Sequence, residues 1–348
     1  MKNAIETKNL TKVFNKFTAV NSLDLEIPNN TIFGMLGPNG AGKTTTIKML
    51  TCLIQPTSGQ AIVGGYDVQK NPDEVRNLLG MVPQQVSLYK DLTVMENSQL
   101  CADYYGVPLD ERDSRIEDLM ELVDIKYAKD KRVGQLSGGQ KQKASLVASL
   151  VHRPDILFLD EPTIGLDPTT KRTLWDLIRE LNDNGHTIIL CSHDMHEVDM
   201  LCDNVGIINT GNFVAYDTPQ GLKDSLLESN KLEMTEALSQ ISEENEVSTS
   251  TKEDIENLSL KKMSILLNNQ TDDIIDSIKK SSDIKSIEIS HNGRINLRVD
   301  GFDDMAVQNV INDIISAGGI IKSISTEEPS LEDVFIKATS EVNEDDRA

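Results

Sequence analysis

The chain has 348 residues, with 56 acidic side chains, 34 basic ones and a formal net charge of −22. This acidity argues against a nucleic-acid-binding surface, which requires clustered lysine and arginine. The hydrophobic fraction of 38% is sufficient for packed cores, and the length indicates two or three domains of about 100–200 residues each.

No apolar run reaches the roughly 18 residues that a membrane-spanning helix needs, so we expect no such helix. Residues 1–7 lack the apolar stretch of a secretory signal, and we expect none. The four cysteines form no CxxC pair, which argues against a zinc site and a disulfide framework. We expect buried thiols in a reducing cytosol at Cys52, Cys101, Cys191 and Cys202.

Residues 1–222 are predicted to form one alternating β/α unit. An apolar strand over 31–36 ends at a glycine-rich turn, and a helix over 44–50 follows it. Further strands are expected at 156–159, 187–190 and 205–208. Each of these three runs is mostly apolar and bounded by polar residues or glycine, the pattern of strands that a parallel sheet buries on both faces.

The stretch from about 86 to 152 has few strand signals. Its apolar residues Ile116, Leu119, Met120 and Val123 recur at helical spacing and share one face. We therefore expect a helical insertion in the α/β core.

An acidic segment follows the β/α unit. Between 228 and 257, nine acidic residues stand against two lysines, and apolar residues are sparse. This composition predicts a solvated linker over 223–260, with a short helix at 231–241 as an option within it.

Residues 261–340 are predicted to form a small α+β domain. Strands are expected at 263–267, 285–290, 294–299 and 320–325, with helices around 274–278 and 307–315. Asn292-Gly293 between the second and third strands is a strong hairpin signal. The order β-α-β-β-α-β is that of a ferredoxin-like fold. A final helix over 331–339 and an acidic tail at 341–348 complete the chain.

The segment from Gly37 to Thr44 reads GPNGAGKT and matches the phosphate-loop pattern GxxxxGK[ST]. Its glycines let several backbone N–H groups face one concavity, to which the next helix adds its positive N-terminus. Lys43 brings a charge to the β- and γ-phosphates, and the Thr44 hydroxyl is a ligand for Mg²⁺. The residues expected to bind the nucleotide here are Gly37, Asn39, Gly40, Ala41, Gly42, Lys43, Thr44 and Thr45.

Two further motifs, LSGGQ at 136–140 and Asp160-Glu161, narrow this prediction. With them, nearly all of residues 4–222 resembles an ATP-binding cassette (ABC) ATPase. The resemblance implies a P-loop α/β fold, namely a RecA-like core with a helical subdomain and an antiparallel β subdomain. The segment PSLEDVF at 329–335 is similar to the C-terminal extension of ATPase subunits of ABC-2-type drug exporters, the daunorubicin-resistance-like group.

The resemblance implies catalytic and metal-binding roles. Asp160, which ends a buried strand, would hold Mg²⁺ through water, and Glu161 would polarise the water that attacks the γ-phosphate. Gln84 matches the Q-loop glutamine, which reaches Mg²⁺ or that water; the adjacent Gln85 is chemically identical. His193 matches the switch histidine, whose N–H donates to the γ-phosphate.

A second anion site is expected where a small-residue turn precedes a helix over 141–150. Its residues are Ser137, Gly138, Gly139 and Gln140. In the family this turn serves the ATP of the opposite subunit, so two chains complete two sites.

Three aromatic or acidic residues leave alternatives open. Asp167 matches the D-loop that joins the halves, although an ordinary Asp-Pro turn also explains it. Phe14 matches the aromatic that stacks on adenine; Phe17 competes with it, and a core role fits either. Trp175 is expected to pack in the core.

The resemblance implies an ATPase with ATP and Mg²⁺ as cofactors, which pairs with a second cassette, here as a homodimer. It would power a separate integral membrane permease from the cytoplasmic face of the membrane and export drugs or other small hydrophobic compounds. The contact region is expected in the helical insertion and at 86–92, where Leu88 and Tyr89 are either anchors or core residues.

The alternative is a soluble ABC ATPase that acts on the ribosome or DNA. The single phosphate loop, the single signature and the net acidity disfavour it. For the C-terminal domain we expect a regulatory or dimer-stabilising role without chemistry, with a small-molecule sensor as the alternative.

Overall fold

The structure is a computed structural model, and it describes residues 3–229, 260–269, 274–275, 278–279, 284–290, 294–300, 305–327 and 329–345. The chain divides into two compact units, Met1–Gln220 with Phe335–Ala348, and Gly221–Val334. Residues 221–229 are helical, whereas the rest of the predicted linker up to 259, including the optional helix at 231–241, lies outside the described residues.

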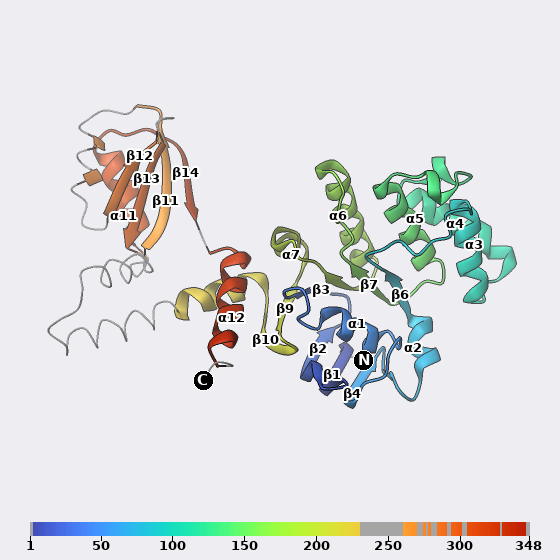
Figure 1. Cartoon of the computed structure of the whole chain (residues 1–348). Helices are drawn as coiled ribbons and strands as arrows, with labels where there is room; N and C mark the ends of the chain where they lie inside the picture. Colours follow the sequence, from blue (N-terminus) through green and yellow to red (C-terminus); the bar gives the residue numbers. More distant parts are fainter. Residues whose placement is uncertain are drawn as a thin grey trace. The chain divides into compact units, whose positions relative to one another are not determined.

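A six-stranded sheet in the order β10-β9-β3-β8-β7-β6 forms the centre of the first unit (Figure 1). Its strands are β3 (Ile32–Leu36), β6 (Leu79–Val82), β7 (Ile156–Asp160), β8 (Thr187–Cys191), β9 (Asn204–Asn209) and β10 (Asn212–Asp217). All neighbours pair in parallel except β10, which returns antiparallel to β9. β3 and β8 are buried throughout, which confirms the expectation drawn from their apolar runs.

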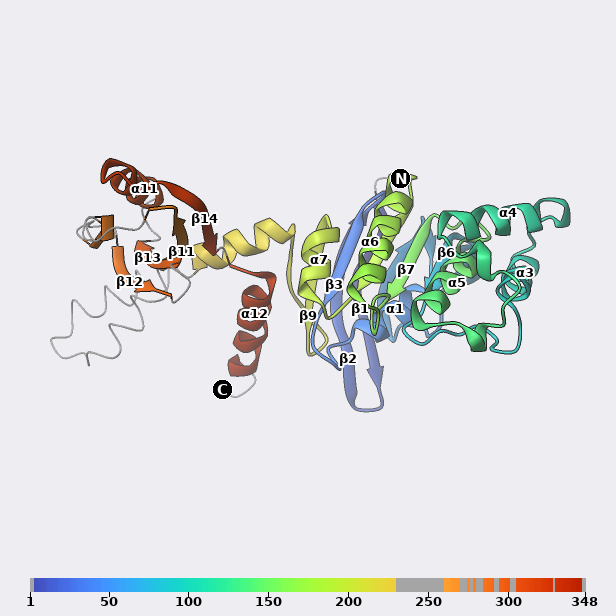
Figure 2. The same cartoon turned by 90° about the horizontal axis from the view of Figure 1, so that it is seen from above.

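Helices cover both faces of this sheet, as parallel strands require (Figure 2). α6 (Pro168–Asp183) and α7 (Met195–Leu201) lie on one face, and α1 (Lys43–Leu50) lies on the other. A second sheet, in the order β2-β1-β4-β5, lies beyond α1 and is antiparallel. It consists of β1 (Asn3–Phe14), β2 (Phe17–Pro28), β4 (Ser58–Val63) and β5 (Tyr66–Asp67).

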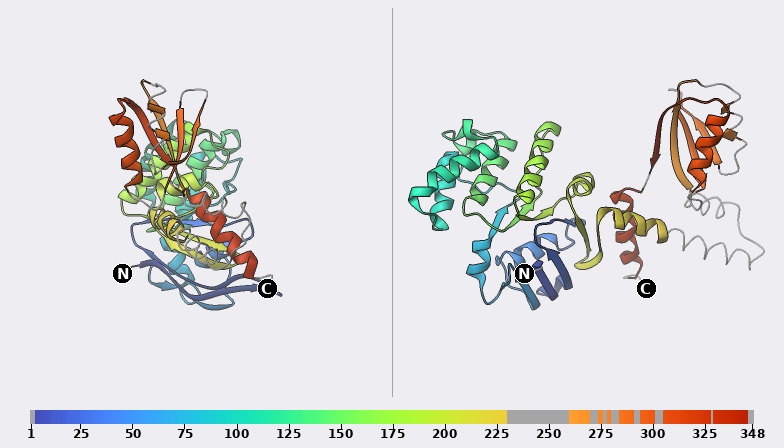
Figure 3. Two further views of the ribbon diagram at one scale, coloured as in Figure 1. Left: turned by 90° about the vertical axis from the view of Figure 1, so that its left-hand side faces the viewer. Right: turned by 180° about the vertical axis from the view of Figure 1, so that it is seen from behind.

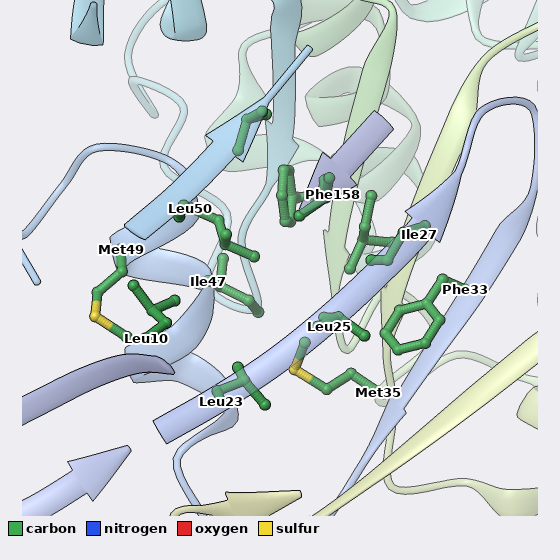
Figure 4. Packing of buried hydrophobic residues seen from close by; sticks show 14 of the residues in the cluster. Leu10, Leu23, Leu25, Ile27, Phe33, Met35, Ile47, Met49, Leu50 and Phe158 are labelled. Atoms are coloured by element: carbon green, nitrogen blue, oxygen red, sulfur yellow. The ribbon is translucent and has the colours of Figure 1, made fainter. Parts of the chain in front are cut away.

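The core between the two sheets fixes where α1 begins. Figure 4 shows its side chains, which come from β1, β2, β3, α1 and β7 and include Leu10, Leu23, Leu25, Ile27, Phe33, Met35, Ile47, Met49, Leu50 and Phe158. Full burial of each contributes about 1.5–3 kcal/mol. The phosphate loop between β3 and α1 is therefore held at both ends by elements of this core.

The predicted helical insertion is present. α3 (Val94–Tyr104), α4 (Leu109–Leu122) and α5 (Gly138–Leu150) pack against one another, and the short helix α2 (Pro72–Leu78) precedes β6. Ile116 and Met120 on α4, with Val123 after it, are buried, which confirms the apolar face predicted for this segment. α3 begins with a capping box, in which Thr93 and Glu96 each bond the other's backbone N–H.

The second unit contains a four-stranded antiparallel sheet in the order β12-β13-β11-β14. The elements are β11 (Leu260–Leu267), β12 (Ile284–Ile289), β13 (Arg294–Asp300), α11 (Ala306–Ser316) and β14 (Ile321–Glu327). In this order the first and third strands are neighbours at the centre, as in the predicted ferredoxin-like fold. α11 lies on one face of the sheet (Figure 3). Its Val310 and Ile314 belong to one buried cluster with Ile265 and Leu297 of the sheet. Asn292-Gly293 lies outside the described residues.

The last helix is longer than predicted. α12 extends over Leu331–Asp345 and so includes 341–345, which the sequence assigns to an acidic tail. One reason is that two of these five residues, Glu341 and Glu344, are glutamate, which is a good helix former. Asn209 donates from its side-chain amide to the Thr339 carbonyl oxygen at 3.1 Å, a contact within the first unit.

All four cysteines are free thiols. Cys191 and Cys202 are buried, and burial raises the pKa of both, whereas Cys52 and Cys101 are half-buried. None of the helices in the described ranges combines the length and the apolar character that crossing a bilayer requires.

Candidate active site

The phosphate loop curls tightly between β3 and α1, and its glycines are required there. Gly40 and Gly42 have φ of +85° and +112°, which favour glycine. A Cβ on Gly37 would lie 2.4 Å from the Ile208 carbonyl oxygen, and one on Gly42 would lie 2.5 Å from the Ala19 carbonyl oxygen. Lys43 donates from its ammonium group to the carbonyl oxygens of Gly37 and Pro38. Its charge therefore lies inside the curl.

The turn between β9 and β10 supports this loop from behind. Gly211 donates its N–H to the Ala41 carbonyl oxygen at 2.9 Å, and its own carbonyl oxygen accepts from Asn21 at 2.8 Å. Gly42 is the N-cap of α1, and because glycine has no side chain, no side-chain cap occupies the first N–H groups of the helix. These N–H groups and the exposed Thr44 hydroxyl are the donors that a phosphate requires.

Asp160 ends β7 beside β8, on the same sheet edge as the loop. Burial raises the pKa of its carboxyl group, the neighbouring Glu161 charge adds to the rise, and Lys43 and Lys48 oppose it. The donors near this edge are the Asp160 carboxylate, the Thr44 hydroxyl and the Gln84 amide, all hard oxygen atoms. This donor set fits Mg²⁺, which proteins bind through one or two carboxylates together with phosphate and water.

The structure brings Glu161 and His193 together. The imidazole Nδ1 lies 2.5 Å from Oε2 of Glu161, although the residues come from the ends of two different strands. Glu161 has φ of +52°, a strained value for a residue with a Cβ, and its N–H donates to the Cys191 carbonyl oxygen at 2.8 Å. This bond to the end of β8 holds the unusual backbone and aims the carboxylate at the histidine.

Gln84 and Gln85 both lie just beyond β6, whose last residue Val82 pairs with Leu159 on β7. Both side chains are exposed, so burial does not distinguish between them. The choice of Gln84 stays a prediction.

The LSGGQ segment forms the start of α5. Ser137 is the N-cap and accepts from the Gln140 N–H, while the Gln140 side chain accepts from the Ser137 N–H at 3.0 Å. Gly138 has open space where a Cβ would lie, whereas a Cβ on Gly139 would lie 2.7 Å from Cγ2 of Thr170. The turn is thus a preformed, largely exposed helix N-terminus without an acidic residue in its first turn.

Asp167 caps α6. Its carboxylate accepts from the hydroxyl and the N–H of Thr170 and from the N–H of Thr169, and these bonds lower its pKa. Within one chain, therefore, helix capping accounts for the presence of an aspartate at this position. This agrees with the alternative that Asp167 belongs to an ordinary Asp-Pro turn.

The core alternatives for three aromatic residues are wrong. Phe14 and Phe17 are partners across the β1–β2 hairpin, with 45% and 63% of their surface exposed. The Lys12 ammonium lies 5.1 Å from the centre of the Phe14 ring. Tyr89 is 64% exposed, so it is a surface residue, while Leu88 is half-buried.

One group of residues has no motif in the sequence. Glu197, which sequence reasoning overlooked, is fully buried and accepts a hydrogen bond from Trp175 at 2.8 Å. Trp175 is buried as expected, but its N–H has this specific partner. No sequence signal marks the pair, because the two residues are 22 positions apart on different helices.

Comparisons with known proteins agree with this geometry. A family model named ABC transporter matches residues 20–164, and a model of the C-terminal domain of DrrA1-3-like ATP-binding proteins matches residues 258–339. The daunorubicin/doxorubicin resistance ATP-binding protein DrrA of Streptomyces peucetius is 40% identical over 223 residues, which cover 64% of this chain and 68% of that protein. The chain belongs to the ABC transporter family.

Other members of the ABC family are similarly close. The linearmycin resistance ATP-binding protein LnrL of Bacillus subtilis is 38% identical over 219 residues, 63% of this chain and 70% of that protein. The solved structure of an ATP-binding subunit of an ABC transporter has a TM-score of 0.59 at 26% identity and covers 64% of this chain and 92% of that one.

A dimeric cassette solved in a post-hydrolysis state with ADP and Pi has a TM-score of 0.57 at 25% identity, over 62% of this chain and 98% of that one. These similarities confirm that the chain has the ABC cassette fold and is an ATP-hydrolysing subunit of a transporter. The alternative of a ribosome- or DNA-acting ATPase gains no support from them.

Proposed function

We propose that this ABC ATPase binds ATP with Mg²⁺ between two copies of the chain and drives the export of drugs or other small hydrophobic compounds through a separate integral membrane permease. The observation that carries the proposal is the contact between Glu161 and His193 at the sheet edge that also presents the phosphate loop. Next to a phosphate loop, a carboxylate that can accept a proton and an imidazole that can donate one are suited to direct a water at a phosphate.

In this proposal the chain's own groups do most of the work by position and charge. The loop N–H groups and Lys43 bind the β- and γ-phosphates, and Phe14 stacks on the adenine. Thr44, Asp160 and Gln84 would hold Mg²⁺, which neutralises charge that develops on the phosphates. Glu161 accepts a proton from, or orients, the attacking water, and His193 donates to the γ-phosphate.

Dimerisation follows from the incompleteness of one chain. The hydrogen bonds of Ser137 and Gln140 connect these residues to each other and to Tyr127, on the helical subdomain and away from the loop. The exposed N-terminus of α5 therefore suits the γ-phosphate of a second copy, and Asp167 would lie at the join.

The permease contact is proposed on the helical subdomain. Tyr89, Leu100, Tyr104 and Leu109 are exposed there, and Tyr104 is 80% exposed. Large exposed apolar side chains in one subdomain favour a protein partner. The drug class is supported by relatives that are named for resistance to linearmycin, daunorubicin and doxorubicin. The site of action would be the cytoplasmic face of the membrane, with residues 261–340 as a non-catalytic accessory domain.

The variant Glu161→Gln tests the proposal in the full chain. With ATP and Mg²⁺ it should hydrolyse ATP at least about 100-fold more slowly than wild type. It should also have the molar mass of a dimer in size-exclusion chromatography with light scattering. The same variant without nucleotide is the control and should be monomeric. Hydrolysis at the wild-type rate would remove Glu161 from the chemistry, and a monomer under all conditions would remove the shared site.

A further inference from the structure

Behind the Glu161–His193 contact lies a second carboxylate, Glu197, in the first turn of α7. Glu197 has no exposed surface. Its Oε2 accepts from the Ser192 hydroxyl at 2.6 Å and from the Thr163 hydroxyl at 3.1 Å, and its Oε1 accepts from the Trp175 indole N–H at 2.8 Å. We call Glu197 with Ser192, Thr163 and Trp175 the Glu197 network.

Two members of the Glu197 network come from segments that carry catalytic groups. Ser192 immediately precedes His193, and Thr163 follows Glu161 by two residues. A single buried carboxylate oxygen thus joins the chain just before the histidine to the chain just after the glutamate. We therefore expect a change in the separation of Ser192 and Thr163 to alter the 2.5 Å contact between His193 and Glu161.

The third member extends this connection to α6. Trp175 lies on that helix, and Lys171, one turn before it, pairs with Asp194. Asp194 is the N-cap of α7 and accepts from the Glu197 N–H at 3.1 Å, while its own N–H donates to the Ser192 hydroxyl at 3.1 Å. Two independent bonds therefore fix α6 against the turn that presents His193.

A carboxylate is the side chain that this geometry requires. It only accepts, and it offers two oxygen atoms to three donors on opposite sides. An apolar residue would leave buried donors on Ser192 and Trp175 without partners, which is costly. Glutamine could keep the indole bond through its oxygen, but its NH₂ group would then face the two hydroxyls and force their hydrogens to find other acceptors.

We propose that Glu197 is a positioning residue for ATP hydrolysis, which sets the separation of Glu161 and His193 through Thr163 and Ser192. The inference rests on the proposed roles of that pair. The nucleotide-binding residues at 37–45 and Phe14 are on other segments, so Glu197 should govern the rate of hydrolysis and leave ATP affinity almost unchanged.

The test measures kcat and KM for ATP in the full chain with Mg²⁺, per active site titrated with a fluorescent ATP analogue. Glu197→Ala should lower kcat about 10- to 100-fold, with KM within about twofold, because small misplacements of reacting groups cost rates of this size. Glu197→Gln should lie between Ala and wild type. Glu180→Gln, an exposed glutamate on α6, is the matched control and should retain wild-type values.

The fluorescence of Trp175 gives a second readout, because it is the single tryptophan of the chain. Its emission should change in Glu197→Ala, where the indole loses its acceptor, and stay near wild type in Glu197→Gln. If Glu197→Ala does not fold, Thr163→Val removes one bond of the network at constant volume and should lower kcat in the same way, while Thr163→Ser restores it.

Two results separate failure of this inference from failure of the proposed function. If Glu161→Gln abolishes hydrolysis while Glu197→Gln and Thr163→Val retain wild-type kcat per active site, Glu197 has no positioning role. If only thermal stability falls, the network is structural and the inference is likewise overturned. If Glu161→Gln itself hydrolyses normally, the catalytic assignment is wrong instead.

Discussion

Gly42→Ala tests whether the curl of the phosphate loop is set by backbone contact. The position has φ of +112°, and a Cβ there would lie 2.5 Å from the Ala19 carbonyl oxygen on β2. Real Cβ atoms essentially never approach so closely, and a backbone oxygen within a sheet cannot turn away. Backbone strain of this kind costs about 1–3 kcal/mol, to which the displacement of β2 or the loop adds.

The strain appears in one of two measurements. If the loop keeps its shape, the free energy of unfolding falls by about 1–3 kcal/mol, which thermal denaturation of the nucleotide-free chain detects. If the loop relaxes instead, ATP must restore its shape on binding, and the affinity falls roughly 5- to 150-fold by calorimetry with a non-hydrolysable analogue.

Gly40→Ala is the matched control for this experiment. Gly40 also has positive φ, at +85°, but a Cβ there would meet nothing within 4 Å. The variant Gly40→Ala therefore has the conformational strain without the clash. Its losses of unfolding free energy and ATP affinity should be smaller than those of Gly42→Ala. Equal losses for Gly40→Ala and Gly42→Ala would show that contact with β2 does not shape the loop, and the reasoning would be refuted.

The remaining predictions concern charge and domain structure. Lys43→Ala should abolish ATP binding at ordinary concentrations by calorimetry, because the loop loses its only ammonium group; tight binding would contradict the assignment. Asp160 has a raised pKa, so its ionised form destabilises the folded state and this cost grows as pH rises through the carboxyl range. Asp160→Asn should therefore raise the melting temperature of the nucleotide-free chain at neutral pH, and the gain should disappear on acidification; a gain independent of pH would exclude the electrostatic cause. Deletion of residues 258–348, which also removes the α12 residues that belong to the first unit, should leave ATP binding intact in calorimetry, and complete loss of binding in a folded deletion would show that the removed part is not separable from the cassette. Limited proteolysis should cut first within 223–260, and primary cleavage inside the cassette at 1–222 would contradict the proposed boundaries.

The central strands were predictable because burial on both faces leaves an unmistakable apolar run, as at 156–160 and 187–191. The β1–β2 hairpin was not predicted from its residues. Its register shifts between Thr7 and Leu10 and again near Lys12, and Asn9 and Asn15 have positive φ. These bulges break the alternation of apolar and polar residues by which a strand is recognised.

The candidate site divides in the same way. The phosphate loop and LSGGQ each consist of consecutive residues. The chemistry of each turn can therefore be predicted from a short stretch of sequence. The contact between Glu161 and His193 spans 32 positions and was not predicted, because the resemblance indicated only a separate role for each residue. The bond between Thr163 and Glu197 spans 34 positions, and neither residue type suggests a role on its own. Only the parallel order of β7 and β8 brings their ends together.

The phosphate loop and the catalytic pair are supported in different ways, and we expect substitutions in the two supports to affect ATP binding and hydrolysis differently. The phosphate loop is fixed by backbone atoms, through Gly211 behind Ala41 and Ala19 beside Gly42. The catalytic pair is fixed by one backbone bond, from the Glu161 N–H to Cys191, and also by side chains, through the buried carboxylate of Glu197. The backbone contacts of the phosphate loop should persist through most nearby substitutions, except those that add a Cβ at the glycines. The hydrogen bonds of Glu197, by contrast, should be lost when one substitution removes its charge. Substitutions at Glu197 should therefore slow hydrolysis in chains that still bind ATP, and substitutions at the loop glycines should lose both together.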